Sequence, residues 1–285
     1  MMNTNDAWQE AWEVRQSVHG GRLTFTRPMA TLPVSLTGGQ CALDCAHCGG
    51  HYLQHMRPIE EVTPGAETSY LISGGCDALG RVPLGGHREA LGRLREGRRM
   101  NWHVGLSSEA DLRPILPYVD VISFDIVGDV ETAREVYGLD VDLSDYIATL
   151  EMLRRLRPVV PHITIGLRGG RLSGERAALR ALQRLGVEHL ILIVFIPTAG
   201  TRYAHCAPPD VEEVGALLVE ARLALPEARL SLGCMRPMGA YRQALDTLAV
   251  RAGFNAIVNP TRAAERLATE RGLQIAWRDE CCALI

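Results

Sequence analysis

The sequence contains no lysine, and all 30 of its basic residues are arginine. This absence excludes a Schiff-base lysine, and with it pyridoxal phosphate chemistry, and it also excludes the lysine of a phosphate-binding P-loop. A large net charge is missing too, because the 33 acidic residues leave a formal net charge of −3. A charge so close to zero gives no general attraction to nucleic acids or membrane surfaces, and we expect neither as a partner.

Long hydrophobic runs are also missing. The longest, "LILIVFIP" at 190–197, is too short to cross a bilayer, and the N-terminal residues lack the apolar segment of a signal peptide. We therefore expect a soluble, cytoplasmic protein. In a reducing compartment, the eight cysteines favour metal ligands or buried thiols over disulfides.

Eight short apolar runs rich in β-branched residues alternate with amphipathic helical segments. Near-continuous apolar strands separated by helices indicate a parallel sheet, and eight such units predict an α/β fold of the (β/α)8, TIM-barrel type. No linker rich in Ser, Gly or Pro divides the chain, which indicates one domain. The predicted strands lie at 31–36, 69–75, 101–106, 120–126, 161–167, 189–196, 229–234 and 255–260.

The barrel is expected to have short additions at both ends. We predict an N-terminal extension over 1–30, the barrel over 31–278 and a cysteine-containing tail over 279–285. In the extension, four residues at helical spacing predict a helix that packs on the barrel, or alternatively one that docks a partner. They are Trp8, Ala11, Trp12 and Arg15.

The stretch "CALDCAHC" carries three cysteines, Cys41, Cys45 and Cys48, just after the first predicted strand. Structural zinc sites normally use four ligands in two close pairs, and a second pair at matching spacing is missing. A C-x3-C-x2-C loop suits an iron–sulfur cluster that is held by three thiolates and keeps one iron open for a substrate or cofactor. We therefore predict a [4Fe–4S] cluster at this loop.

The spacing and position of these cysteines resemble the signature of the radical S-adenosylmethionine superfamily. The resemblance implies that the open iron binds the amino and carboxylate groups of S-adenosylmethionine. It also implies reductive cleavage to methionine and a 5′-deoxyadenosyl radical, which abstracts hydrogen, with a reductant such as ferredoxin or flavodoxin as partner. One departure is His47, which stands where the family usually has an aromatic residue before the third cysteine.

Other stretches resemble the segments that bind S-adenosylmethionine in this family. "ISGGCD" resembles the glycine-rich motif after the second strand, where a close backbone approach requires residues without Cβ, although Cys76 replaces the usual Glu. "SFDIVGD", "ITIGL" and "FIPTAGT" resemble the ends of the fourth, fifth and sixth strands, which contact ribose and adenine. The residues implied to bind the cofactor are Ser73, Gly74, Gly75, Asp125 with Asp129 as the second choice, Ile196 and Pro197.

Five cysteines lie outside the triplet. Cys76, Cys206 and Cys234 follow predicted strands, so we expect them at the C-terminal face of the barrel, where barrel active sites form. The tail adds the adjacent pair Cys281 and Cys282. One interpretation is an auxiliary [4Fe–4S] cluster with ligands among these five, because soft thiolates favour such centres. The alternatives are unrelated buried cysteines, and a disordered or redox-active tail pair.

Longer stretches resemble a narrower branch of the superfamily, which contains biotin synthase and lipoyl synthase. "ISGGCDALGRVPL", "GCMRPMGAYRQALDTLAVRAGFNAIVNPT" and "ECCAL" resemble one protein of the two-component lipoyl synthases. This resemblance implies a sulfurtransferase that inserts sulfur into a protein-bound octanoyl chain, with the auxiliary cluster as the sacrificed sulfur source. The implied partners are the second radical S-adenosylmethionine protein of the pair and an octanoylated lipoyl-carrier protein or peptide.

Two other functions stay open on the sequence. The same branch contains methylornithine synthase and hydrogenase maturases, so a single-cluster mutase or maturase is one alternative. A cluster-binding scaffold subunit without turnover of its own is the other. Arg168 and Arg236 could bind a carboxylate, or they could form ion pairs within the barrel.

Overall fold

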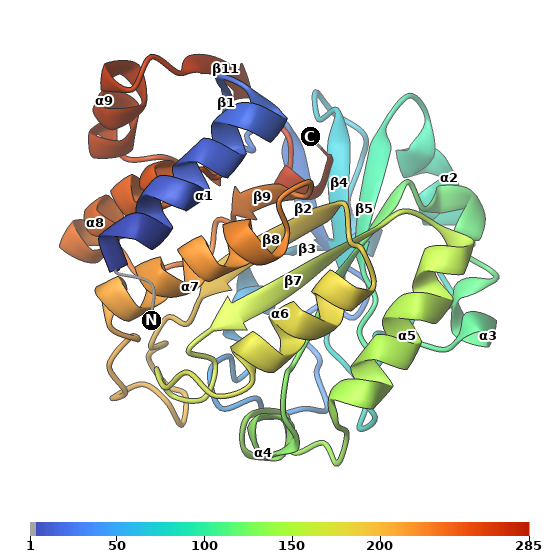
Figure 1. Cartoon of the computed structure of the whole chain (residues 1–285). Helices are drawn as coiled ribbons and strands as arrows, with labels where there is room; N and C mark the ends of the chain where they lie inside the picture. Colours follow the sequence, from blue (N-terminus) through green and yellow to red (C-terminus); the bar gives the residue numbers. More distant parts are fainter. Residues whose placement is uncertain (1–3, 285) are drawn as a thin grey trace.

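The computed structural model describes residues 4–284, which form a curled parallel sheet with helices packed around its outer face (Figure 1). Residues 1–3 and 285, the outermost parts of the predicted extension and tail, lie outside the described residues. The strands are hydrogen-bonded in the order β11-β1-β10-β9-β8-β7-β6-β5-β4-β2-β3. This arrangement confirms the predicted α/β fold of TIM-barrel type.

All eight predicted strands are present, within a few residues of their expected ends. Their β-branched and aliphatic residues alternate between the helix-covered face and the lumen, as the pleat of a strand requires. They are β2 (Thr31–Ser35), β4 (Ser69–Ser73), β5 (Arg99–His103), β6 (Val121–Asp125), β7 (Val159–Ile165), β8 (His189–Val194), β9 (Arg229–Leu232) and β10 (Ala256–Val258).

Three further strands extend the sheet at its ends. β1 (Arg22–Thr26) lies inside the predicted extension and pairs with both β10 and β11 (Gln274–Arg278), while β3 (Arg57–Pro58) pairs with β2. Within residues 4–284, no ladder joins β11 or β1 to β2 or β3. The sheet is therefore a partial, TIM-like barrel with an open seam between its first and last strands.

The tail crosses this seam and enters the barrel. The Ala30 N–H donates to the Asp279 C=O at 2.8 Å, and the Cys281 N–H donates to the Thr31 hydroxyl at 2.8 Å. The turn η5 (Cys282–Leu284) then contacts β5 and β6, at the end of the barrel opposite α4 (Figure 1). Its buried side chains pack on strand residues that include Val121, Val160, Ile191 and Val258.

The helices of the outer layer bury apolar side chains against the sheet, and α5, α7 and α9 begin at polar capping residues. In α5, for example, Asp142 caps the N-terminus and Asp145 returns the hydrogen bond, forming a capping box. The longer outer helices are α2 (Arg88–Arg95), α5 (Leu143–Leu156), α6 (Glu175–Arg184), α7 (Val211–Ala224), α8 (Gly239–Arg251) and α9 (Arg262–Glu270). Two short helical turns, α3 (Glu109–Leu112) and α4 (Val130–Thr132), complete the layer.

The N-terminal helix α1 (Thr4–His19) packs on this layer against α7. A Cβ added to Gly215 would lie 3.4 Å from the Trp8 ring, so the two helices meet closely there. Arg15 is fully buried, and its guanidinium donates to the Arg22 C=O at 2.8 Å. The predicted residues at helical spacing therefore face the barrel, as expected for a helix that packs on it.

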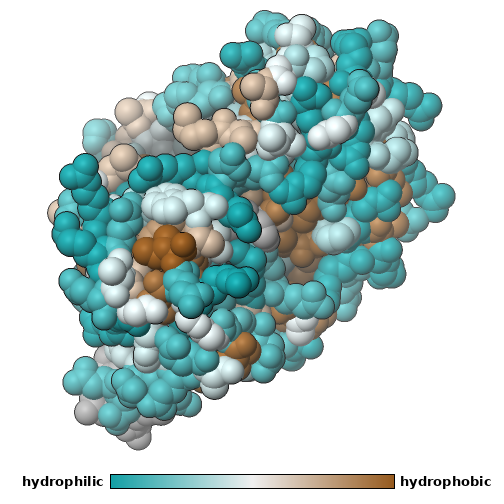
Figure 2. Space-filling view, turned by 90° about the horizontal axis from the view of Figure 1, so that it is seen from above, coloured by the Kyte–Doolittle hydropathy of each residue, from teal (hydrophilic) through white to brown (hydrophobic). Residues whose placement is uncertain are grey.

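The surface gives no sign of a membrane-spanning element. No helix among residues 4–284 combines the length and hydrophobicity needed to cross a bilayer. The face seen from above in Figure 2 is mostly hydrophilic, with apolar side chains gathered in small, separate patches.

Candidate functional site

The three cysteines of the triplet lie in the loop that follows β2, here called the cysteine loop (residues 37–50). The loop is held by its own backbone, since the Cys48 N–H donates to the Cys45 C=O at 3.0 Å. At its start, the Thr37 hydroxyl donates to the Gln40 C=O at 2.8 Å. Because the loop follows β2, the thiols lie at the carboxyl end of the strands, where barrel active sites form.

The glycine-rich segment after β4 packs directly on this loop. The Gly75 N–H donates to the Thr37 hydroxyl at 2.7 Å, and the Cys76 N–H donates to the Cys41 sulfur at 3.3 Å. A Cβ on Gly75 would lie only 2.0 Å from the Gln40 carbonyl oxygen. Glycine at position 75 is therefore required by the close approach of the two loops, and Thr37 is a positioning residue that sequence patterns did not indicate.

Replacing Gly75 with alanine is expected to separate the two loops. The added methyl group forces a backbone shift, which should cost about 1–3 kcal/mol of unfolding free energy, and it should lower the iron bound per chain after anaerobic reconstitution. Gly85→Ala is the matched control, because a Cβ there meets no atom within 4 Å. Equal iron content in the two variants would contradict this role of Gly75.

Glu135, on the connection between β6 and α5, is the centre of a group of hydrogen bonds that supports the cysteine loop. Glu135 lies in a π-helical turn, η4 (Ala133–Tyr137), a conformation frequent at functional sites. It accepts hydrogen bonds from the Tyr203 hydroxyl at 2.6 Å and from Arg168 Nε at 2.7 Å, while the Tyr203 N–H donates to the Ala46 C=O at 2.9 Å. Arg168 therefore forms an ion pair within the barrel. The sequence did not indicate this group, because Arg168 and Tyr203 are 33 and 68 residues away from Glu135.

The end of β8 also lies beside the cysteine loop. The Thr198 hydroxyl donates to the Ile196 C=O at 3.1 Å, and it lies 3.2 Å from the hydroxyl of Tyr52, which follows the loop. Ile196 and Pro197 are half-buried. The segment predicted to contact adenine is thus adjacent to the predicted cluster loop.

Asp125 ends β6 and belongs to a polar group in the lumen with His103 and His162. His103 Nδ1 lies 3.7 Å from the Asp125 carboxylate, and the two imidazole rings are 5.5 Å apart. Burial favours the neutral carboxyl, but the close approach and charge of His103 outweigh it and lower the pKa of Asp125. Half of the Asp125 side chain is exposed to the open lumen, so a ligand can reach it. Asp129, the second choice, caps α4 by accepting from the Thr132 N–H at 2.7 Å.

The His103–Asp125 pair should make stability depend on pH. Burial alone lowers the pKa of His103, but the close approach and charge of Asp125 raise it above the ordinary value. The pair is therefore fully stabilising between about pH 4, above which even an unfolded aspartate is ionised, and about pH 6.5, below which even an unfolded histidine is protonated. Its contribution is lost as the pH rises through the raised pKa of His103. We expect anaerobic urea unfolding to give His103→Asn its largest deficit near pH 5.5. A deficit of constant size from pH 5.5 to 9 would contradict this assignment.

Four thiols surround the mouth of the lumen, here called the upper thiol group: Cys41, Cys45, Cys48 and Cys76. Burial raises the pKa of Cys45 to about 12, and the charges of the three other thiols add to the effect. Burial raises the pKa of Cys76 to about 12, and the charges of Cys41, Asp77, Asp125 and Cys48 add to the effect. Thiolates this close repel one another, so ionising them together requires a multiply charged cation at their centre.

The tail forms a second set inside the barrel, here called the lower thiol group: Cys234, Cys281 and Cys282. A hydrogen bond from Cys282 lowers the pKa of Cys281, although burial opposes the shift, and the Asn101 amide donates to the Cys281 sulfur at 3.5 Å. Burial raises the pKa of Cys234, and the charge of Cys281 raises it further. Cys206 belongs to neither group, because it packs against Gly169 in the loop after β7. The five candidate auxiliary ligands are therefore divided among three places.

The donor set fits a cluster better than a single ion. Among the described residues, no three or more His, Cys, Asp or Glu side chains stand ready to bind one metal ion. A single zinc ion needs every thiolate within about 2.3 Å, whereas a [4Fe–4S] cluster spreads its thiolates over several iron atoms. The buried Nδ1 of His47, which lacks a hydrogen-bond partner, also marks the cysteine loop as a site with unmet polar contacts.

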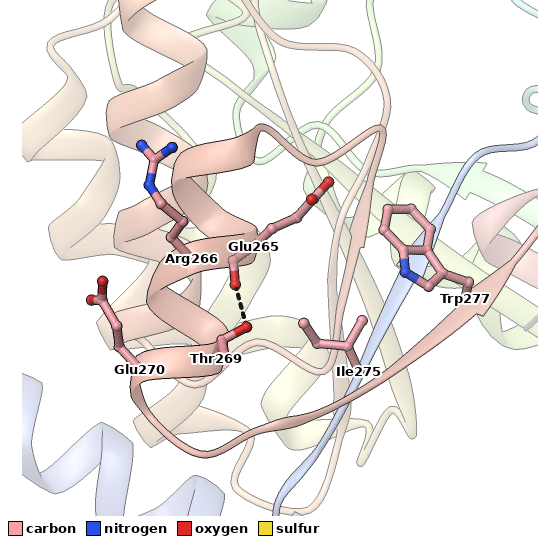
Figure 3. A pocket seen from close by; sticks show the side chains of 6 residues that line it. All are labelled: Glu265, Arg266, Thr269, Glu270, Ile275 and Trp277. Carbon is pink, nitrogen blue, oxygen red and sulfur yellow. Dashed lines mark hydrogen bonds between the residues drawn. The ribbon is translucent and has the colours of Figure 1, made fainter.

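Two hollows of the molecule are candidate sites. A cavity of about 120 Å³ lies below the cysteine loop and is lined by Cys45, Cys76, Asp125, Tyr137 and Tyr146 among others. A groove of about 490 Å³ lies between α9 and the edge strand β11, where Glu265 and Trp277 face each other across Ile275 (Figure 3). The groove holds no thiol, so the smaller cavity is the candidate site.

Comparison with known proteins finds one similar curated sequence. No family model matches the chain. It is 25% identical over 271 residues to the biotin synthase of Bordetella avium (strain 197N), a match that covers 85% of this chain and 80% of that protein. The chain is therefore similar to a biotin synthase over most of its length.

Solved structures support the fold of this chain. Methylornithine synthase (PylB) superposes with a TM-score of 0.67 at 14% identity, covering 97% of this chain and 90% of that one. The maturase HydG of the [FeFe]-hydrogenase from Carboxydothermus hydrogenoformans gives 0.68 at 14% identity, covering 96% and 72%. At such low identity, these two likenesses establish the architecture alone.

Proposed function

We propose that this protein is a radical S-adenosylmethionine sulfurtransferase and one component of a two-protein lipoyl synthase. The observation that carries the proposal is the lower thiol group, which lies in the lumen apart from the cysteine loop. Radical hydrogen abstraction needs one cluster, whereas sulfur insertion also needs a sulfur source within reach of the substrate. An auxiliary cluster on Cys234, Cys281 and Cys282 would supply that sulfur.

The residues have distinct roles in this proposal. Cys41, Cys45 and Cys48 would hold the radical cluster, which together with S-adenosylmethionine supplies a carbon radical able to abstract hydrogen. Ser73, Gly74 and Gly75 would bind the methionine end of the cofactor, since glycine lets the backbone approach closely. The ionised Asp125 would accept hydrogen bonds from ribose hydroxyls. The barrel wall holds the substrate in place and excludes water.

The partners follow from the chemistry. A sulfur-inserting enzyme of this kind needs an electron donor such as ferredoxin or flavodoxin. Its substrate would be an octanoyl chain on a lipoyl-carrier protein or peptide, and a second radical S-adenosylmethionine protein would insert the other sulfur.

The test is a thiolation assay. The reconstituted protein is mixed with its second component, an octanoylated peptide, S-adenosylmethionine and a reductant, and mass spectrometry follows the peptide and 5′-deoxyadenosine. We expect a peptide carrying added sulfur, and a Cys281→Ser/Cys282→Ser variant that still forms 5′-deoxyadenosine but transfers no sulfur. Wild-type protein that forms 5′-deoxyadenosine without any thiolated peptide would overturn the proposal.

One observation favours a second candidate, a single-cluster mutase or maturase. His103, Asp125 and His162 make the lumen polar, which suits a substrate with amino and carboxylate groups better than a plain alkyl chain. Methylornithine synthase and HydG share the fold. Iron content decides between the two candidates, because a single-cluster enzyme needs no metal at the lower thiol group.

A further inference from the structure

The thiol of Cys76 is not used by the function proposed above. It stands at the mouth of the lumen with the three cysteines of the loop, whereas the other cysteines outside the triplet lie elsewhere. The four thiols come from two loops, after β2 and after β4, and these strands are neighbours in the sheet.

The backbone holds Cys76 against the cysteine loop from both sides. Its N–H donates to the Cys41 sulfur at 3.3 Å, and its C=O accepts from the Ala42 N–H at 2.7 Å. The absence of a Cβ at Gly75 permits this pairing, as described above. Position 76 is therefore fixed relative to Cys41 and cannot swing away without breaking two hydrogen bonds.

The side chain of Cys76 also faces the cysteine loop. Cys76 and Cys45 line the same cavity of about 120 Å³, together with Asp125. Four thiolates are the usual complement of a [4Fe–4S] cluster, and the triplet alone supplies three. Cys206, by contrast, packs on Gly169, so it offers a matched cysteine outside the upper thiol group.

We propose that Cys76 is a fourth, displaceable ligand of the cluster on Cys41, Cys45 and Cys48, bound while S-adenosylmethionine is absent. The inference rests on the proposed radical cluster. Binding of S-adenosylmethionine breaks the iron–sulfur bond to Cys76, and the thiolate leaves with its electron pair. Bonds from the amino and carboxylate groups replace it, so no electron is transferred. The resting cluster is thereby protected from losing its fourth iron.

The test measures how easily that iron is lost. In a Cys281→Ala/Cys282→Ala background, which removes the lower thiol group, each protein is reconstituted anaerobically and treated with ferricyanide without S-adenosylmethionine. Electron paramagnetic resonance then counts the [3Fe–4S] clusters formed. We expect at least a fivefold higher yield in Cys76→Ala than in the background protein, and no increase in Cys206→Ala. Cys76→Ser, which keeps the side-chain volume, should behave as Cys76→Ala.

S-adenosylmethionine provides the second readout. It occupies the fourth iron itself, so it should lower the [3Fe–4S] yield of Cys76→Ala toward that of the background protein, and because no thiolate has to be displaced there, it should bind Cys76→Ala more tightly, by about tenfold or 1.4 kcal/mol. Equal yields and equal affinities in all variants would overturn the role of Cys76. A protein that keeps its iron and this protection but never forms 5′-deoxyadenosine would instead overturn the proposed function. Failure of every variant to bind iron would overturn both.

Discussion

Replacing Cys41, Cys45 and Cys48 together with alanine is expected to abolish 5′-deoxyadenosine formation while about four iron atoms stay bound. The activity is lost because the triplet would hold the cluster that delivers the electron. The remaining iron would sit on the lower thiol group, which the cysteine loop does not touch. Iron analysis with Mössbauer spectroscopy on the anaerobically reconstituted variant measures both effects.

The converse variant is the control for this experiment. Cys281→Ala/Cys282→Ala should keep 5′-deoxyadenosine formation and lose the second cluster. A folded triple variant without iron would contradict the auxiliary site and leave single-cluster radical chemistry. If the isolated wild-type protein cleaves no S-adenosylmethionine under reduction, a scaffold subunit becomes the better description.

Replacing Arg236 with methionine is expected to lower the unfolding free energy by about 3–5 kcal/mol, because it strands a buried charge. Arg236 and Asp246 are both fully buried, and Arg236 Nε lies 2.8 Å from the Asp246 carboxylate. The guanidinium also donates to the C=O groups of Gly233 and Val258. Anaerobic urea unfolding of the reconstituted protein measures the loss.

Arg176→Met is the matched control, because its ion pair with Glu220 has the same 2.8 Å separation but is half exposed. Exposed pairs of this kind contribute about 0–1 kcal/mol. Similar losses in the two variants would contradict the argument from burial. Tighter binding of S-adenosylmethionine by wild-type protein than by Arg236→Met at equal stability would instead point to a role in ligand binding.

The strands of the barrel could be predicted from the sequence because their signal is local. Each of the eight runs is short, apolar and bounded by turn residues, and the structure places a strand in each. β1 was not predicted, and its residues fell within the predicted extension. Its place between β10 and β11 depends on pairing with residues more than 200 positions away.

Only cysteines that lie close together in the sequence could be grouped before the structure was known. Cys41, Cys45 and Cys48 share one loop, so their spacing carries the prediction. Strand-end position could not separate Cys76, which meets the cysteine loop, from Cys206, which packs on a neighbouring loop, because both follow barrel strands. The tail pair was expected to fold back, yet its entry into the lumen follows from long-range contacts across the seam.

The roles of two arginines also depend on partners that are distant in the sequence. The motif around Arg236 is compatible with a ligand-binding guanidinium, and only the fold brings Asp246 of α8 against it. Arg168 likewise meets Glu135 of the π-helical turn. Each forms an ion pair within the barrel, which sequence analysis left as one of two interpretations.

The open seam has a mechanical consequence. In a closed barrel, a complete hydrogen-bond ladder fixes the circumference. Among residues 4–284, the seam beside β2 is bridged by the tail through contacts such as Cys281 to Thr31, with no ladder across it. The circumference here is therefore set by a few contacts of the tail and not by a strand ladder. We expect structures with different bound substrates to differ mainly by rotation of the two flanks about this line.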